Sequence, residues 1–225
     1  MTTLLLIRHG ENEFTATGRL AGRLPGVHLN ERGRRQAVAL AGVLGSAPIQ
    51  AIYSSPLERA LETAAPLAAV LGLEVQVEAG LIEIEMGKWT GRPLKELGKL
   101  KAWKVLQETP SRFGFPGGET FVAIQARCVA AVEGIATRHP EGLVACFSHG
   151  DIIRVLTAHF LNVPLDSFQR LNIDTTSITQ VNLGKDGRVS VPRVNQVMDF
   201  AWPGKREEAK RAPQRREGRR ETQRE

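Results

Sequence analysis

The sequence predicts a three-layer α/β/α fold, in which helices cover both faces of a mainly parallel central sheet. Two observations indicate this fold. Short apolar runs with strand character alternate with longer segments of helical periodicity, and 225 residues suffice for one large α/β domain. Strands that follow one another through helices pair in parallel, because each helix must pack back onto the sheet.

The first half of the chain opens with a buried strand at residues 4–7, a run of Leu and Ile. Asn30 is a favoured N-cap residue and precedes a helical segment. The apolar stripe expected on that helix consists of Val38, Leu40, Ala41 and Leu44. Residues 51–53 read as a second strand. Pro56, which is well suited to a first helical turn, then opens a helix that runs through Leu71.

The second half continues the same alternation. A third strand is expected at residues 74–77, a long helix at 119–138, a fourth strand at 143–147 and a further helix at 151–161. The apolar residues of the long helix are Val122, Ile124, Val129, Val132 and Ile135. Residues 178–183 and 189–194 flank a Lys-Asp-Gly turn, a pattern typical of a hairpin.

Composition agrees with a globular protein, since 42% of the residues are hydrophobic and 24% are charged. This content excludes wholesale disorder. Cys128 and Cys146 lie in apolar stretches, so we expect reduced thiols in the core and no disulfide framework. The sequence shows neither a membrane span of ~18 apolar residues nor a signal peptide, and therefore predicts a cytoplasmic protein without membrane contact.

The net charge of +6 is concentrated at the C-terminus. Residues 1–203 form the expected domain, whereas residues 204–225 carry nine Lys/Arg, five Asp/Glu and no large apolar side chain. Such a segment cannot bury enough surface to fold, so we expect a mobile tail. Because acids interrupt its basic residues and it lacks aromatic side chains, we expect at most weak, non-specific binding to nucleic acid.

Polar residues gather where the predicted strands end. These are Arg8, His9 and Gly10 after the first strand, Ser54, Ser55 and Arg59 after the second, and Ser148, His149 and Gly150 after the fourth. In parallel sheets the carboxyl ends of strands share one edge, where ligands bind. Two guanidinium groups, two imidazoles and helix N-termini together predict an anion pocket, with phosphate as the obvious anion. No histidine pair has metal-ligand spacing, and we expect no metal and no cofactor.

A set of ordered motifs resembles a known family. They are Leu6-Ile7-Arg8-His9-Gly10-Glu11, Leu29-Asn30-Glu31-Arg32-Gly33, Ser54-Ser55-Pro56-Leu57-Glu58-Arg59-Ala60, Leu81-Ile82-Glu83-Ile84, Gly87-Lys88-Trp89-Thr90-Gly91, Pro116-Gly117-Gly118-Glu119-Thr120 and Ser148-His149-Gly150. By these motifs the chain is similar to the histidine phosphatase superfamily, the phosphoglycerate mutase-like proteins. The resemblance covers residues 4–183 and implies the fold of that family.

The resemblance implies a role for each motif residue. His9 would be the nucleophile that accepts the phosphoryl group. Arg8, Arg59 and His149 would bind the phosphoryl oxygens, and Glu83 would protonate the leaving oxygen and then activate water. The chemistry agrees, since fixed cations can stabilise phosphoryl transfer and a covalent intermediate needs an unprotonated imidazole.

Three residues depart from the family pattern. Asn12 stands where the family usually has Ser or Thr, and Thr15 stands where it has Asn. The amide of Asn12 can still bind phosphate, so we expect it in the substrate pocket together with the Gly150 backbone. Asp151 adds a carboxylate near the mouth of the pocket.

Residues 88–118 leave the strand–helix rhythm and are expected to cover the pocket as a substrate lid. The basic residues of this segment are Lys88, Arg92, Lys95, Lys99, Lys101, Lys104 and Arg112. Arg92, Lys95 and Lys99 recur at helical spacing, which favours a solvated helix face over a surface that attracts anionic esters. The lid has no adjacent pair of arginines to hold a second phosphate together with a carboxylate.

The sequence therefore favours a metal-independent phosphomonoester hydrolase that acts through phospho-His9. The alternative is a cofactor-dependent phosphoglycerate mutase. A non-catalytic protein that uses its basic tail on nucleic acid is the third hypothesis, and it is disfavoured because His9, Glu83 and His149 are all present. The sequence determines neither the ester nor the oligomeric state.

Overall fold

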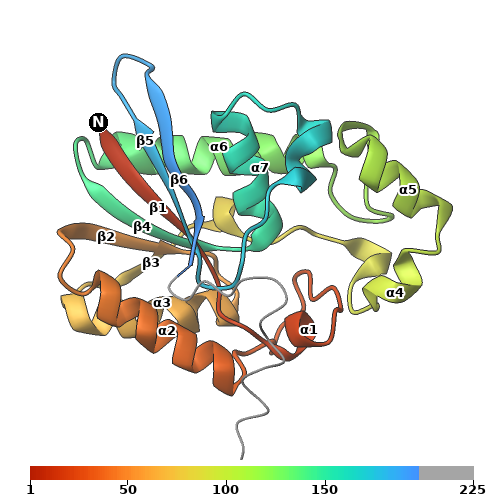
Figure 1. Cartoon of the computed structure of the whole chain (residues 1–225), viewed down its shortest axis with the longest axis horizontal. Coiled ribbons are helices and arrows are strands. Elements are labelled where there is room, and N and C mark those ends of the chain that lie inside the picture. The colour runs from red at the N-terminus through yellow and green to blue at the C-terminus, as the bar shows by residue number, and fades with distance from the viewer. Residues whose placement is uncertain (198–225) are drawn as a thin grey trace, which may run out of the picture.

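A six-stranded sheet forms the centre of the computed structural model, which describes residues 1–197 of the chain. The strands are β1 (Thr2–Arg8), β2 (Ile49–Ser54), β3 (Val75–Val77), β4 (Leu143–Ser148), β5 (Ile178–Leu183) and β6 (Val189–Gln196). Their order across the sheet is β3-β2-β4-β1-β5-β6 (Figure 1). The first four strands pair in parallel, and β5 and β6 form an antiparallel hairpin at one edge, so the mainly parallel sheet is confirmed.

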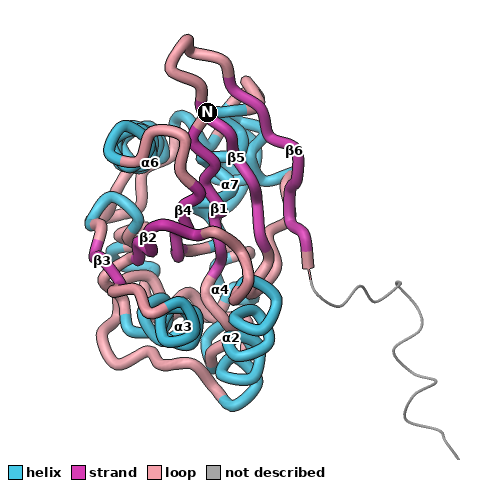
Figure 2. Tube along the Cα trace, turned by 90° about the vertical axis from the view of Figure 1, so that its left-hand side faces the viewer, coloured by secondary structure: helices cyan, strands magenta, loops and turns pink. Residues whose placement is uncertain are grey.

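Helices cover both faces of this sheet (Figures 1 and 2). On one face lie α2 (Glu31–Leu44) and α3 (Glu58–Leu71), and on the other lie α6 (Phe121–Arg138) and α7 (Gly150–Phe160). Successive side chains of a strand point to opposite faces of the sheet. A strand covered by helices on both faces therefore carries apolar side chains at successive positions, which alternate between the two helix layers. The predicted three-layer α/β/α fold is confirmed.

Strand β1 shows how one apolar run supplies two cores. Leu4 and Leu6 join the cluster beneath α6 and α7, whereas Leu5 and Ile7 join the cluster against α2 and α3. Both cysteines belong to the first cluster as free thiols, as expected. Burial raises the pKa of each thiol to about 12, so neither is a reactive thiolate.

The segment between the third strand and α6 is built from short helices. They are η1 (Ala79–Leu81), η2 (Gly87–Trp89), α4 (Leu94–Leu97), α5 (Lys101–Glu108) and η3 (Pro110–Arg112), whereas α1 (Glu13–Ala16) and η4 (Leu165–Arg170) lie elsewhere. Trp89 anchors this segment by stacking on Trp103 and packing against Phe113 and Phe115. Within residues 1–197, no helix is long and apolar enough to cross a membrane.

Two predicted core residues lie on the surface instead. Val38 of α2 is 63% exposed and Val122 of α6 is 55% exposed. The buried stripe of α2 consists of Ala37, Leu40, Ala41 and Leu44, with spacings of three and four residues. Val38 follows Ala37 by one residue, about 100° around the helix, and therefore points off the stripe. Val122 stands in the same relation to buried Phe121.

Two helices start later than predicted, because a preceding residue is extended. Helix α3 begins at Glu58 and not at Pro56, since Leu57 has φ −77° and ψ 139° and its N–H donates to Ser55 Oγ. Helix α6 begins at Phe121, because Thr120 caps it by accepting a hydrogen bond from the Ala123 N–H.

The loop after β1 packs backbone to backbone against the first turn of α2. A Cβ atom on Gly33 would lie 2.0 Å from the Glu11 carbonyl oxygen, and one on Gly10 would lie 2.8 Å from the Gly33 carbonyl oxygen. Only two glycines allow this approach. Gly10 is thus required for the contact with α2.

We predict that Gly33→Ala lowers the free energy of unfolding by about 1–3 kcal/mol, because neither backbone segment can move away from the new methyl group. Gly42→Ala in the same helix is the matched control, since a Cβ there meets nothing within 4 Å. It is expected to be neutral or to stabilise by up to about 1 kcal/mol. Denaturant unfolding measures both variants, and equal effects would contradict the close packing.

Candidate active site

The parallel pairing of β1 with β4 brings the two histidine motifs together. Arg8 lies opposite Ser148 in this register, and the N–H of His9 donates to the Ser148 carbonyl oxygen at 2.9 Å. The rings of His9 and His149 are therefore neighbours, with centroids 5.2 Å apart. Two residues 140 positions apart in the chain thus share one edge of the sheet, as the strand ends predicted.

His9 is held as a neutral ring with one nitrogen free. Its Nδ1 lies 2.7 Å from the Gly10 carbonyl oxygen, which can only accept a hydrogen bond, so Nδ1 carries the proton. Burial, and then the charges of Arg8 and Arg59, hold the pKa of His9 well below its usual value. The Nε2 lone pair is consequently available to a nucleophilic reaction at neutral pH.

Several buried donors nearby have no partner in the described chain. Arg59 is 1% exposed, and only its Nη2 is used, in a 2.8 Å bond to the Gly22 carbonyl oxygen. Its Nε and Nη1 lack hydrogen bonds, as do Arg8 Nε, Asn12 Nδ2 and His149 Nδ1. Buried donors without acceptors are costly, and cationic ones more so. Such a set fits a bound anion that supplies several oxygens.

Asn12 has two functions in this arrangement. Its Oδ1 accepts the N–H of Thr15 at 2.9 Å and so caps the short helix α1, while Nδ2 stays buried and unpaired. Two of the three departures from the family pattern, Asn12 and Thr15, are thus bonded to each other. The cavity that Asn12 lines is also lined by Arg8 and Arg59.

His149 is fixed by a serine at the end of β2. Its Nε2 lies 2.8 Å from Ser55 Oγ, and the ring is completely buried. Its Nδ1 lies 3.8 Å from Glu83 Oε2. Burial and then the neighbouring Arg59 hold the pKa of His149 well below its usual value, so this ring is neutral as well.

Glu83 is 9% exposed and lies on the same pocket. Burial, and then repulsion by Asp151, raise its pKa to about 7, although Arg59 and the Ile84 N–H act in the opposite direction. The Ile84 N–H donates to Glu83 Oε1 at 3.0 Å and orients the carboxyl group. A carboxyl group that ionises near neutral pH can both give and take a proton.

The loop that carries Glu83 is held by a clamp that the sequence analysis missed. Arg127 of α6 donates to the carbonyl oxygens of Gly80, Ile82 and Glu83. Arg23 donates to the Glu83 carbonyl oxygen from the other side, at 2.8 Å. Glu119 accepts hydrogen bonds from both arginines. No local pattern marks Arg127, because the carbonyl oxygens that it binds lie 44–47 residues away in the chain.

Gly150 allows Arg8 to lie against the first turn of α7. A Cβ atom at Gly150 would lie 3.2 Å from Arg8 Nε, in the space beside the guanidinium group. The N-terminus of α7, an 11-residue helix, therefore faces the same pocket as this cation. Both favour an anion there.

A cavity of about 190 Å³ is lined by predicted site residues, and His149 is not among its lining residues; the predicted ones that line it are Arg8, His9, Asn12, Arg59, Glu83 and Gly150. From the segment of residues 88–118, only Leu94 lines it, and none of the seven basic residues of that segment does. The interpretation of Arg92, Lys95 and Lys99 as a solvated face agrees with the contacts, since Arg92 pairs with Glu96 and both lysines are exposed. The alternative, a lid whose basic residues cover the pocket, does not agree with these contacts.

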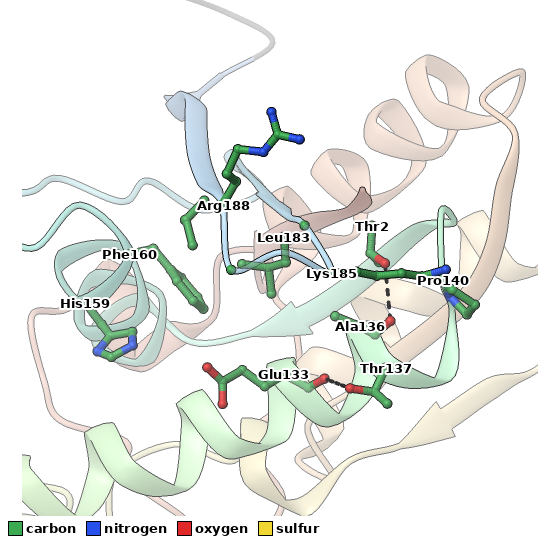
Figure 3. Close-up of a pocket in the computed structure, with 13 residues that line it drawn as sticks. Thr2, Glu133, Ala136, Thr137, Pro140, His159, Phe160, Leu183, Lys185 and Arg188 are labelled. Carbon is green, nitrogen blue, oxygen red and sulfur yellow. Dashed lines mark hydrogen bonds between the residues drawn. The ribbon is translucent and has the colours of Figure 1, made fainter.

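A larger cavity of about 520 Å³ lies at the opposite end of β1 (Figure 3). Thr2, Phe160 and Leu183 line it, together with the exposed charged residues Lys185 and Arg188. It contains none of the predicted site residues and no buried unpartnered donor. Size alone therefore does not locate the chemistry. Among residues 1–197 there is also no cluster of three His, Cys, Asp or Glu that could hold a metal ion.

A cavity lined by a neutral imidazole, a carboxyl group of raised pKa and two guanidinium groups is typical of an α/β enzyme of phosphoryl transfer. The comparisons with known proteins agree. The family model of the histidine phosphatase superfamily (branch 1) matches residues 4–196. The chain belongs to this superfamily, and the predicted phosphatase class of enzyme is confirmed.

Several relatives are named as phosphatases. The chain is 33% identical to phosphoserine phosphatase 1 of Hydrogenobacter thermophilus over 185 residues, which cover 81% of this chain and 87% of that protein. A mycobacterial glucosyl-3-phosphoglycerate phosphatase complexed with VO3 has a similar structure, with a TM-score of 0.79, 30% identity, and coverage of 87% of this chain and 99% of that one. The chain also matches a bifunctional protein of Mycobacterium tuberculosis at 36% identity over 202 residues, 87% of this chain but 54% of that protein.

We predict that inorganic phosphate raises the Tm of the protein, and that Arg59→Met removes this gain by deleting two unpaired donors. At a concentration of about 100 times Kd, phosphate would stabilise the folded state by about 2.7 kcal/mol. Lys95→Met, which removes an exposed cation of the lid segment, should keep the full gain. Thermal unfolding over a phosphate series measures this, and an equal gain in Arg59→Met would contradict the anion site.

Proposed function

We propose that this protein hydrolyses small phosphate monoesters through a phosphohistidine formed on His9. The observation that carries the proposal is the set of buried, unpartnered donors on Arg8, Arg59, Asn12 and His149, placed around the free Nε2 of a neutral histidine. A phosphoryl group supplies the oxygens that these donors lack. The donors are fixed before the substrate arrives, so little reorganisation is needed in the transition state.

In the first step, His9 Nε2 attacks phosphorus and the ester P–O bond breaks. The carboxylic acid of Glu83 gives its proton to the leaving oxygen, which departs as an alcohol. Glu83 can do this because its pKa of about 7 leaves it largely protonated below neutral pH. Arg8 and Arg59 stabilise the negative charge on the phosphoryl oxygens throughout.

In the second step, the Glu83 carboxylate takes a proton from a water molecule, whose oxygen attacks phosphorus. The bond to His9 Nε2 breaks and inorganic phosphate leaves. His149 contributes a hydrogen bond to the phosphoryl group if its proton is on Nδ1, the tautomer in which the Ser55 hydroxyl donates to Nε2. Ser55 then acts as the residue that fixes this tautomer.

Hydrolysis is favoured over mutase activity by the contents of the cavity. A mutase must hold a second anionic group while a bisphosphorylated intermediate turns over, and it must exclude water meanwhile. Here the cavity is about 190 Å³, and none of the lid cations lines it. Of the lid segment, residues 88–118, only the apolar side chain of Leu94 lines the cavity. The segment therefore covers the pocket with an apolar side chain and not with its cations.

The substrates named for two relatives, phosphoserine and glucosyl-3-phosphoglycerate, suggest a small phosphate monoester that also carries a carboxylate. We propose the same class of ester for this chain. The tail of residues 204–225 lies outside the described residues. Its mobility and its weak, non-specific affinity for nucleic acid stay predictions, as does the cytoplasmic location.

We predict that His9→Ala lowers kcat/KM by a factor of at least about 10³ and traps no acid-labile phosphate on the protein. Glu83→Gln should lose a factor of about 10²–10⁴ on alkyl phosphates, whose leaving oxygen needs a proton. It should still be phosphorylated by p-nitrophenyl phosphate, because the nitrophenolate leaving group needs no proton. Phosphate release and acid-quench labelling measure these effects.

Glu85→Gln is the matched control for this experiment. Glu85 is a carboxylate two residues from Glu83, but it is 41% exposed on its side chain and lies near Arg23. Its substitution should leave the dependence on the leaving group unchanged. Substantial turnover by His9→Ala, or the same leaving-group dependence in both glutamine variants, would refute the assigned roles.

The pH dependence of kcat/KM follows from the sign of the Glu83 shift. The pKa is raised to about 7 and the protonated acid is the active form, so activity should be present below pH 7 and fall as the pH rises through it. This alkaline limb of the profile, the fall in activity above pH 7, should disappear in Glu83→Gln. It should move to lower pH in Asp151→Asn, because one repulsive charge is gone. A limb that persists unchanged in Glu83→Gln would assign it to another group.

A further inference from the structure

One ion pair on the catalytic cavity is not used by the reaction. Asp151 and Arg154, in the first two turns of α7, both line the cavity, and Arg154 Nη1 donates to Asp151 Oδ1 at 2.9 Å. Their side chains are 29% and 28% exposed, so the pair faces the entrance and not the buried core. An ion pair at the rim is accessible to the part of the substrate that extends beyond the phosphate.

The other ionisable residues of the cavity are already engaged. Arg8, His9, Arg59 and Glu83 surround the phosphoryl position. Arg19 donates from Nε and Nη2 to the Gly91 carbonyl oxygen and lies over the Phe14 ring, so it ties the wall of the cavity to the lid segment. Asp151 and Arg154 are the two charged residues left to meet the rest of the substrate.

Each member of this pair keeps a polar atom that no hydrogen bond in residues 1–197 uses. Arg154 Nε is buried and has no partner, although Nη1 is bonded to Asp151. Asp151 binds through Oδ1, and its second oxygen Oδ2 has no recorded donor within the described part of the chain. The pair therefore offers one acceptor and one donor to a ligand.

A carboxylate is unexpected in a pocket built for an anion. The charge of Asp151 adds to the burial that raises the pKa of Glu83, and it opposes the burial that lowers the pKa of Arg8. It would repel a substrate that is anionic throughout. A substrate with a cationic group beside its anionic one removes this conflict, because each charge finds its opposite.

We propose that the Asp151–Arg154 pair is a subsite for a zwitterion, with the substrate's ammonium on Asp151 and its carboxylate on Arg154. This rests on the proposed function and makes the substrate the phosphate ester of a hydroxy-α-amino acid. In an α-amino acid the ammonium and the carboxylate are attached to the same carbon atom. They can therefore bind to Asp151 and Arg154 at the same time, since these two side chains are in contact. The small cavity restricts the chain between that carbon and the phosphate to a few atoms.

The test compares kcat/KM for four small phosphate esters that carry different combinations of these two charged groups. O-phosphoserine has ammonium and carboxylate, 3-phosphoglycerate has the carboxylate, phosphoethanolamine has the ammonium, and glycerol 3-phosphate has neither. Wild-type protein should prefer O-phosphoserine by about tenfold or more over each other ester, the scale of one hydrogen bond between charged groups. Equal rates on all four would overturn the proposal.

Two variants separate the two halves of the subsite. Asp151→Asn should lower the ratio of O-phosphoserine to 3-phosphoglycerate by about tenfold, and Arg154→Gln should lower the ratio of O-phosphoserine to phosphoethanolamine by a similar factor. Ratios within one variant cancel any effect of Asp151 on Glu83, which acts on every ester alike. A fall in all four rates by one common factor, with lower Tm, would show a purely structural pair and refute the subsite.

Arg92→Gln is the matched control, since it breaks the i,i+4 pair with Glu96 in the lid segment, away from the cavity. It should leave all ratios unchanged. Hydrolysis of p-nitrophenyl phosphate by the wild-type protein distinguishes the two proposals. Turnover of that ester without preference for O-phosphoserine refutes the zwitterion subsite alone, whereas no turnover that depends on His9 refutes the proposed function and the subsite with it.

Discussion

The parallel pairing of β1 with β4 is the constraint on which the site depends. Arg8 lies opposite Ser148, and each of these residues is followed by a histidine. The pairing therefore brings His9 and His149 to the same level at the end of their strands. A shift of one residue would reverse the faces of every apolar side chain in β1, so the two cores hold this register firmly. The position of His9 beside His149 is thus fixed by packing energy spread over whole strands, and not by contacts between the two rings.

The same edge concentrates features that oppose stability. Arg59 is buried with two nitrogens unpaired, Glu83 is a buried acid, and both imidazoles are kept neutral by burial and nearby cations. Each costs free energy, and in the proposed mechanism a phosphoryl group offsets much of this cost by supplying acceptors and charge. The clamp of Arg127, Glu119 and Arg23 keeps the Glu83 loop in place despite this cost, because it satisfies four backbone carbonyl contacts with fixed guanidinium forks.

The proposed mechanism and the proposed subsite separate catalysis from selectivity along α7. Its N-terminus and Gly150 belong to the phosphoryl position, where Arg8 packs against the helix, whereas Asp151 and Arg154 in the following residues face the entrance. A single helix can therefore hold the reacting group in one place and present charges to the remainder of the substrate a turn further on. The lid segment takes a smaller part than its charge suggests, since its aromatic cluster around Trp89 fixes it to the body and its cations face outward.

The sequence by itself determined the sheet, the order of the elements and the residues at the strand ends. These depend on local rules: period-2 and period-3.6 patterns, capping by Asn30, and motifs such as Ser148-His149-Gly150. Only the tertiary structure decided which helix face is buried, leaving Val38 and Val122 in solvent, and that Arg127 holds the loop of Glu83. It also decided that Arg154, and not the lid lysines, lines the cavity beside Asp151, which the sequence had already placed near the pocket. The physical reason is that these contacts join segments tens of residues apart, and their geometry follows from strand register and helix packing that no local pattern encodes.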